Sequence, residues 1–113
     1  MRDFVFVKDI AHGIASALEI KDLNPFTACN LGSGAAVPIR QLVATMRQFF
    51  PEWSGAINEA PARVGDIVHS AADISAAERL LSYHPRYSLK SGLGEMLQLR
   101  ETSVTSPNVS NRV

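Results

Sequence analysis

Residues 2–11, RDFVFVKDIA, decide how the chain begins to fold. The run of aromatic and β-branched side chains at positions 4–7 has the composition of a strand. Apolar side chains then recur at helical spacing, and the carboxylate of Asp9 can accept an amide hydrogen from a first helical turn. We therefore expect a strand over residues 4–7 that leads into a helix over about residues 9–20.

The remainder of the chain repeats this alternation of short apolar runs and helical patterns. Pro38 opens the next helical pattern, because its fixed φ suits a first turn. Ser75 and Glu78 stand three residues apart, which is the spacing of a capping box. The further expected strands are 26–31 and 55–60, and the further expected helices are 38–50, 74–82 and 89–100. Crossover connections of this kind favour parallel strands, so the predicted fold class is α/β, with about three short strands and four helices.

The length of 113 residues allows a single domain, which we expect over residues 1–100. Polar, aperiodic sequence then predicts a disordered tail over residues 101–113. Eleven Lys and Arg residues balance 11 Asp and Glu residues, and the two signs alternate along the chain. Because no basic stripe forms that could follow a phosphate backbone, a nucleic-acid partner is not expected.

Neither a membrane segment nor an export signal is expected. The longest uncharged stretch, residues 23–39, contains two Pro, two Gly and two Asn, and the apolar run at positions 4–7 is too short for a signal peptide. The single cysteine, Cys29, excludes an intrachain disulfide, and its place in an apolar run predicts a buried thiol. These features predict a cytoplasmic protein.

The segment Gly32-Ser33-Gly34 lies between a predicted strand and a predicted helix, where free backbone amides could cradle a phosphate. The third glycine of a G-x-G-x-x-G loop is replaced by Val37, and Pro38 removes one amide. We interpret the segment as a plain turn; the alternative, a phosphate cradle, would predict affinity for NAD without a sugar.

Catalytic and metal-binding patterns are not found. His12, His69 and His84 share no short ligand spacing with one another or with Cys29, so no metal site is expected. Ser33 stands in G-S-G rather than in the G-x-S-x-G of a nucleophile turn. We therefore expect no catalytic residue in this chain.

Two arginines are candidates for binding an anion. Arg2 precedes the first expected strand, and Arg63 lies in a loop beside Asp66, where a guanidinium can project without belonging to a packed face. The planar guanidinium carries five donors and suits a diphosphate. Solvated surface arginines are the alternative interpretation.

Four blocks of the sequence resemble, in the same order, motifs of the NAD-dependent epimerase/dehydratase family, the extended short-chain dehydrogenases that act on nucleotide sugars. Residues 2–11 are similar to its R-D-[FY]-[IV]-[HY]-V-x-D-[VIL]-A segment, residues 30–34 to its N-[LIV]-G-S-G strand end, residues 63–66 to its R-x-G-D loop and residues 72–81 to its A-D-x-S-K-A-x-x-x-L-G helix. The resemblance covers about residues 2–97 and is strongest for enzymes like UDP-glucose 4-epimerase.

The resemblance implies the C-terminal, substrate-binding portion of a Rossmann-type enzyme. In that family the residues matching Arg2 and Arg63 contact the nucleotide diphosphate, and the acid matching Asp66 lies near the nucleotide ribose. These three residues are therefore the candidate substrate-binding residues, and a nucleotide-diphosphate sugar is the expected ligand.

The resemblance also implies what this portion lacks. The family's glycine-rich NAD-binding loop lies outside the matched region, and neither Tyr83 nor Tyr87 is followed four residues later by the Lys of the catalytic Tyr-x-x-x-Lys. We expect no cofactor in this chain itself, with NAD held by the intact family enzyme or by a separate NAD-binding chain, and no catalysis by this chain alone. The alternative function is a non-catalytic interaction module: the exposed edge of residues 26–31 would pair with another chain, so a homo-oligomer is expected.

Overall fold

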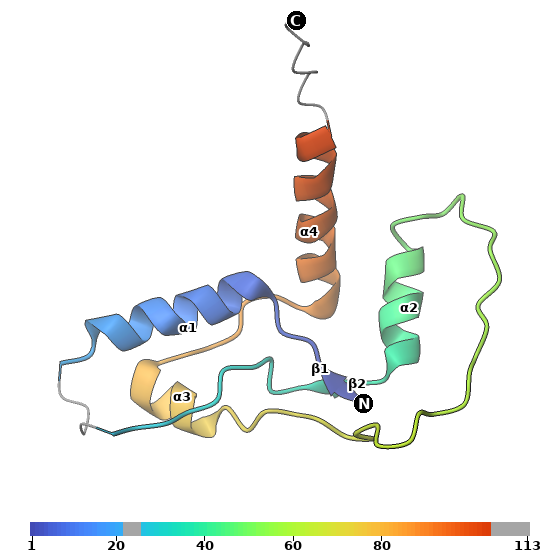
Figure 1. Cartoon of the computed structure of the whole chain (residues 1–113). Coiled ribbons are helices and arrows are strands. Elements are labelled where there is room, and N and C mark those ends of the chain that lie inside the picture. Colours follow the sequence, from blue (N-terminus) through green and yellow to red (C-terminus); the bar gives the residue numbers. More distant parts are fainter. Residues whose placement is uncertain (22–25, 105–113) are drawn as a thin grey trace, which may run out of the picture.

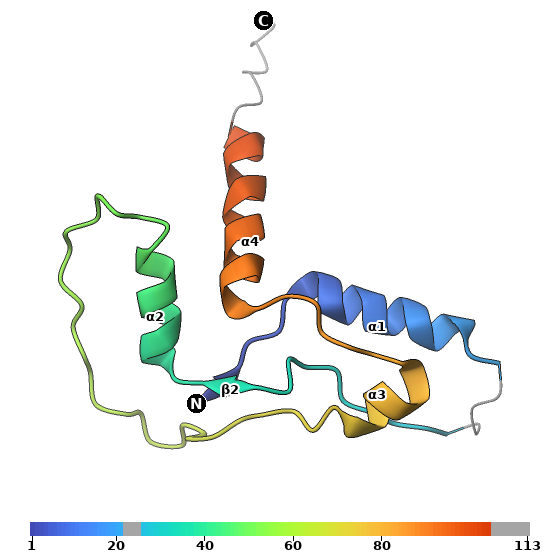
Figure 2. The same cartoon turned by 180° about the vertical axis from the view of Figure 1, so that it is seen from behind.

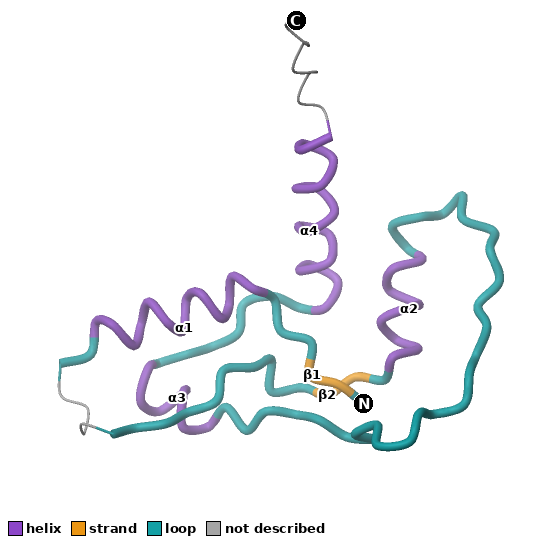
Figure 3. Tube along the Cα trace, in the orientation of Figure 1, coloured by secondary structure: helices purple, strands orange, loops and turns teal. Residues whose placement is uncertain are grey.

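The computed structural model describes residues 1–21 and 26–104 of the chain, and it describes side chains up to residue 98. Within these residues the chain forms two very short strands and four helices. Figure 1 shows how they are arranged, and Figure 3 shows that long irregular segments connect them. In chain order the elements are β1 (Arg2–Asp3), α1 (Val7–Glu19), β2 (Ala36–Val37), α2 (Ile39–Arg47), α3 (Ser75–Leu81) and α4 (Leu89–Val104).

The sheet consists of β1 and β2 paired antiparallel, with Arg2 opposite Val37 and Asp3 opposite Ala36. The α/β class is confirmed in this coarse form, but the expected three strands and their parallel pairing are not. The segments 4–6, 26–31 and 55–60 do not form strands in the part of the chain that the structure describes. The physical reason is that an apolar composition only favours the strand conformation, whereas a strand also needs a neighbouring backbone to pair with.

The exposure of Cys29 has the same physical cause as the missing strand at residues 26–31. The sequence predicted a buried thiol inside a strand, but Cys29 is exposed. Without neighbouring strands on either side, residues 26–30 lie exposed along the surface. The prediction was wrong because burial in a strand depends on the sheet around it.

Four helices were expected and four are observed within the described residues, but two of the predicted caps are wrong. Helix α1 begins at Val7, and its N-cap residue, Phe6, makes no side-chain capping bond. The N-cap of α3 is Ile74, also without a side-chain bond, so the predicted capping box of Ser75 and Glu78 does not form. Instead, the backbone N–H of Ser75 donates to the carboxylate of Asp73 at 3.0 Å.

Helix α4 extends further than the sequence predicted. Its bounds, Leu89–Val104, include residues 101–104, which the sequence assigned to the tail. The rest of the expected tail, residues 105–113, lies outside the described residues.

The buried core is small and lies between α1 and α3. It consists of Ala77, Leu81 and Tyr83, and four half-buried apolar side chains pack around it, those of Ile20, Leu31, Ile74 and Leu80. Figures 1 and 2 show the two-stranded sheet near the centre, with α1 and α3 on one side of it and α2 on the other. The radius of gyration is 18.9 Å, compared with about 13 Å for a compact domain of this length. The chain is therefore an open arrangement of helices rather than a closed globule.

Gly13 lets α1 approach this core closely. A Cβ atom at this position would lie 2.7 Å from Leu31 Cδ1 and 3.1 Å from Tyr83 Cδ2. The missing side chain, rather than an unusual backbone angle, is what the packing requires. No helix within the described residues is long and apolar enough to cross a membrane.

Candidate nucleotide-sugar site

Residues 63–66 form a tight turn. The N–H of Asp66 donates to the carbonyl of Arg63 at 3.1 Å, and the Asp66 carboxylate accepts the N–H of Arg63 at 3.3 Å. Gly65 has a φ of +88°, and no atom lies within 4 Å of the position that a Cβ would take, so the glycine is needed for its backbone angle, as in a type II turn. Arg63 and Asp66 are both exposed at this turn.

Arg2 lies against the residues that follow the turn. Its Nη1 donates to the carbonyl of Ile67 and to that of Met1. The backbone of Met1 adds two bonds to the same segment, since its N-terminus donates to the Val68 carbonyl at 2.6 Å and its carbonyl accepts the N–H of Ser70 at 3.1 Å. The structure therefore holds the Arg2 guanidinium one residue beyond Asp66, although the two are 64 positions apart in sequence.

The Asp3 carboxylate joins three segments of the chain. It accepts hydrogen bonds from the hydroxyl and N–H of Ser33, from the N–H of Gly34 and from the N–H of Ala72, at distances between 2.5 and 3.2 Å. Burial by itself raises the pKa of Asp3, but these hydrogen bonds lower it more, so the pKa lies below its ordinary value.

This carboxylate also decides between the two interpretations of Gly32-Ser33-Gly34. The backbone amides of Ser33 and Gly34, which a phosphate would need, are already bound to Asp3. An internal anion thus occupies the position that the phosphate-cradle alternative requires, and the plain turn is the better interpretation.

Two further side chains hold loops in place. The buried Tyr83 hydroxyl donates to the Gly32 carbonyl at 2.8 Å, and burial together with the negative charges of Asp9 and Asp3 raises the pKa of Tyr83. Asp9, expected as a helix cap, is instead buried, and its carboxylate accepts the N–H groups of Arg86 at 2.9 Å and Tyr87 at 3.2 Å.

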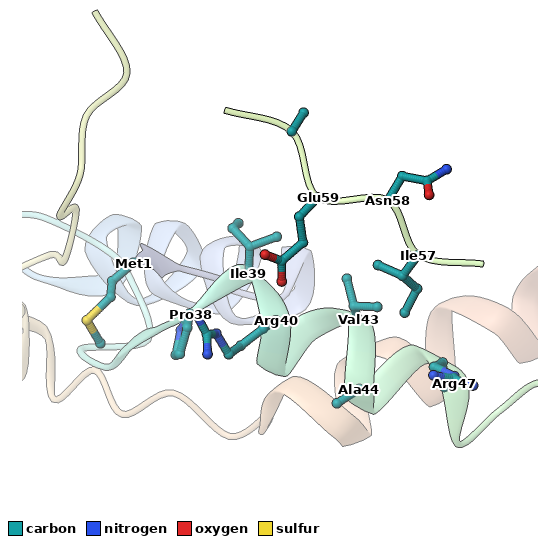
Figure 4. A pocket seen from close by; sticks show the side chains of 11 residues that line it. Met1, Pro38, Ile39, Arg40, Val43, Ala44, Arg47, Ile57, Asn58 and Glu59 are labelled. Atoms are coloured by element: carbon teal, nitrogen blue, oxygen red, sulfur yellow. The ribbon is translucent and has the colours of Figure 1, made fainter. Parts of the chain in front are cut away.

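A cleft of about 640 Å³ lies between α2 and the segment 57–60, and Met1 forms part of its wall. Figure 4 shows Ile57 facing Val43 across it and Glu59 reaching toward α2. Arg40 and Arg47 also line the cleft, and sequence reasoning missed both. Their spacing of seven residues, which places two side chains on the same helix face, was the available signal.

The three predicted site residues are thus only partly brought together. Arg2 is bound beside the end of the 63–66 turn, which contains Arg63 and Asp66. None of the three lines the cleft, but Met1, next to Arg2, does.

Comparison with solved structures shows which larger folds contain this arrangement of elements. The chain superposes on MoeE5, solved with UDP-glucuronic acid and NAD, with a TM-score of 0.76 at 24% identity, covering 89% of this chain and 33% of that one. It superposes on WbmF of Bordetella bronchiseptica, solved with NADH, with a TM-score of 0.73 at 23% identity, covering 91% of this chain and 30% of that one. The chain therefore has the fold of part of these two larger, Rossmann-type structures.

Relatives in sequence show which kind of enzyme the chain resembles. The chain is 30% identical over 99 residues to dTDP-L-rhamnose 4-epimerase of Burkholderia thailandensis, covering 84% of this chain and 26% of the relative. It is 29% identical over 109 residues to UDP-glucuronate 4-epimerase 4 of Arabidopsis thaliana, covering 86% of this chain and 25% of the relative. No family model matches the chain.

These relatives confirm the resemblance to the NAD-dependent epimerase/dehydratase family: the chain is a homologue of nucleotide-sugar 4-epimerases. It spans about a quarter of the length of these curated relatives.

Proposed function

We propose that this chain is the C-terminal, nucleotide-sugar-binding portion of an NAD-dependent epimerase/dehydratase. The relatives named above act on dTDP-L-rhamnose and UDP-glucuronate, and both compounds combine a nucleoside diphosphate with a sugar. The diphosphate is the shared feature that a small set of cationic side chains can recognise.

In this proposal Arg2 and Arg63 bind the diphosphate and Asp66 lies against the ribose. The main support for this assignment is the hydrogen bond from Arg2 Nη1 to the Ile67 carbonyl. This bond fixes the Arg2 guanidinium beside the turn that contains Arg63 and Asp66. Only Nη1 of Arg2 is used in bonds within the described residues, so Nη2 and Nε can donate to a phosphate. The exposed position of Arg63 leaves its guanidinium accessible to the same ligand.

The catalytic step belongs to the intact enzyme. When bound, NAD supplies transient oxidation of the sugar, and we expect the NAD-binding portion to be either the same longer polypeptide or a separate chain. The role of the present residues is to bind and orient the nucleotide end of the substrate, so this chain alone is expected to bind the nucleotide sugar without converting it.

Calorimetric titration with UDP-glucose and with a dTDP-sugar tests the proposal. Losing one charge-assisted contact costs about 1.5–3 kcal/mol, so Arg63→Ala is expected to weaken binding at least tenfold. Arg79→Ala is the matched control, because Arg79 is an exposed arginine in the last turn of α3. Equal affinities for the wild type and Arg63→Ala would remove Arg63 from the site.

The second candidate function is a non-catalytic interaction module. The exposure of residues 26–30, which the family resemblance places in a sheet, favours it. This function predicts a homodimer or larger assembly that forms without a nucleotide sugar. Sedimentation of a monomer at high concentration would count against it.

A further inference from the structure

A second cavity, of about 370 Å³, lies around the C-terminal end of α2. Its wall consists of four apolar side chains and one arginine, and we call it the α2 pocket: Val43, Met46, Arg47, Phe50 and Trp53. Met46, Phe50 and Trp53 are 38%, 48% and 44% exposed, so the pocket is open to the solvent. Large apolar side chains that gather around an open pocket are typical of a site for a ligand with an apolar group.

The backbone after α2 holds Trp53 against the end of the helix. The N–H of Trp53 donates to the Phe50 carbonyl at 3.1 Å, which turns the chain back toward α2. The guanidinium carbon of Arg47 lies 5.5 Å from the centroid of the Trp53 ring, in a cation–π contact. A Cβ atom at Gly55 would collide with the ring, so the glycine lets Trp53 lie against the backbone. One wall of the α2 pocket is therefore an aromatic ring with a positive charge at its face.

Arg47 connects the α2 pocket with the cleft of about 640 Å³ described above. Arg47 and Val43 line both cavities, so the two adjoin. Arg40 also lines the cleft, and its guanidinium makes no hydrogen bond or ion pair within the described residues. The carboxylate of Glu59 reaches toward α2 (Figure 4), but within that part of the chain it forms no ion pair with either arginine. The side chains on the cleft side thus carry two positive charges and one negative charge, beside an apolar pocket.

We propose that the α2 pocket and the adjoining end of the cleft bind an amphipathic anion, a hydrocarbon group that ends in a carboxylate or a phosphate. The hydrocarbon lies against Met46, Phe50 and Trp53, which removes apolar surface from water. The acid is bound by Arg47, because a planar guanidinium matches the oxygens of either head group. The unpaired Arg40 adds a second positive charge that favours an anion over a cation.

This site is separate from the proposed nucleotide-sugar site. Arg2, Arg63 and Asp66 line neither the cleft nor the α2 pocket. The α2 pocket also lacks hydrogen-bonding side chains other than Arg47, so its chemistry suits a hydrocarbon rather than a sugar or a nucleobase. The inference therefore goes beyond the proposed function and does not depend on it.

The fluorescence of Trp53 tests the proposal directly, because Trp53 is the single tryptophan of the protein. The full chain is titrated with decanoate and with decyl phosphate, both below the concentration at which they form micelles. We expect a saturable change with at least one of them, and the tighter of the two identifies the head group. Decylamine has a chain of the same length with a positive head group, and butyrate keeps the carboxylate but has a short chain. Each is expected to bind at least tenfold more weakly than decanoate.

Substitutions separate the two halves of the site. Arg47→Gln removes the charge and Met46→Gln makes the apolar wall polar, and isothermal titration is expected to show at least tenfold and threefold weaker binding of decanoate, respectively. Arg79→Gln and Met96→Gln are the matched controls, because both residues are exposed and lie on α3 and α4, outside the two cavities. Each control should leave the affinity within twofold, and circular dichroism verifies that every variant is folded.

Four outcomes would overturn the proposal. They are no saturable response to either anion, equal affinities for decylamine and decanoate, an unchanged affinity in Arg47→Gln, and displacement of decanoate by UDP-glucuronic acid. The last result would assign the cleft to the nucleotide-sugar site. If Arg47→Gln does not fold, the comparison of decanoate with decylamine on the wild-type chain still decides, because only recognition of the negative head group distinguishes the two.

Discussion

Asp3 shows how much of the local architecture depends on one side chain. Its carboxylate connects β1 with the turn after residue 32 and with the segment before α3. Arg2, the adjacent residue, is the candidate diphosphate ligand, so Asp3 also helps to set where that guanidinium lies. The sequence alone could propose Arg2, Arg63 and Asp66 as candidates through a family motif, but it could not reveal this network, because the partners of Asp3 are 30 and 69 positions away.

Replacing Asp3 is expected to destabilise the fold. Asp3→Asn keeps the shape of the side chain but presents an N–H₂ group to donors that need an acceptor. Because the carboxylate is only partly buried and solvent screens its bonds, we expect a loss of about 1–3 kcal/mol in the free energy of unfolding. Urea unfolding measures it, with Asp66→Asn as the control; equal losses in the two variants would contradict the role of Asp3.

The pH dependence of the free energy of unfolding should reveal the contribution of the Asp3 carboxylate. Its pKa in the folded chain lies below the ordinary value of 3.8, so its contribution is present above that pH and is lost as the pH falls through and below it. The stability difference between wild type and Asp3→Asn should therefore shrink on acidification from pH 6 to pH 3. A difference that stays constant over this range would show that Asp3 contributes nothing through its charge.

Tyr83 offers a second test of what a single side chain contributes to stability. Tyr83→Phe removes the donor to the Gly32 carbonyl and leaves a buried acceptor unpaired, which costs about 1–2 kcal/mol. Tyr87→Phe is the control, because the Tyr87 hydroxyl makes no hydrogen bond within the described residues while its ring still contacts Phe6. Thermal unfolding should show a lower Tm for the first variant only.

Among the elements, helices were easier to predict than strands. The apolar spacing located all four helices to within a few residues, because a helix satisfies its own backbone and needs only local sequence. Strand pairing joins distant segments, and the observed strands, Arg2–Asp3 and Ala36–Val37, are two residues each, too short to carry an alternating apolar pattern. The candidate site was likewise predictable only where a local motif exists, at the R-x-G-D turn and at Arg2, and not in the cleft lined by Arg40 and Arg47.

Helix α1 provides a test of packing. A glycine within a helix normally costs stability relative to a larger residue, but a side chain at Gly13 would collide with Leu31 and Tyr83. Gly13→Val is therefore expected to lower the free energy of unfolding by about 1–3 kcal/mol. Ala15→Val, on the exposed side of the same helix, should cost less than 1 kcal/mol because only β-branching opposes it. Unfolding by urea compares the two, and equal losses would show that close packing at Gly13 is unimportant.

The whole molecule has an open shape and a small core. Its radius of gyration of 18.9 Å and the exposed side chains of Ile14, Leu18 and Phe26 describe a chain with more apolar surface than it can cover by itself. The sequence composition could not reveal this, because composition counts apolar residues without showing which of them find partners. The chain superposes on about a third of each of two larger structures.

We propose that a nucleoside-diphosphate sugar binds beside Arg2 and the turn at residues 63–66. Titrating the ¹⁵N-labelled chain with UDP-glucuronic acid and following its amide resonances tests this claim. We predict shifts centred on Arg2 and residues 63–67, with no comparable shifts at residues 32–34. Shifts confined to residues 32–34, or an unchanged spectrum at millimolar ligand, would contradict the claim.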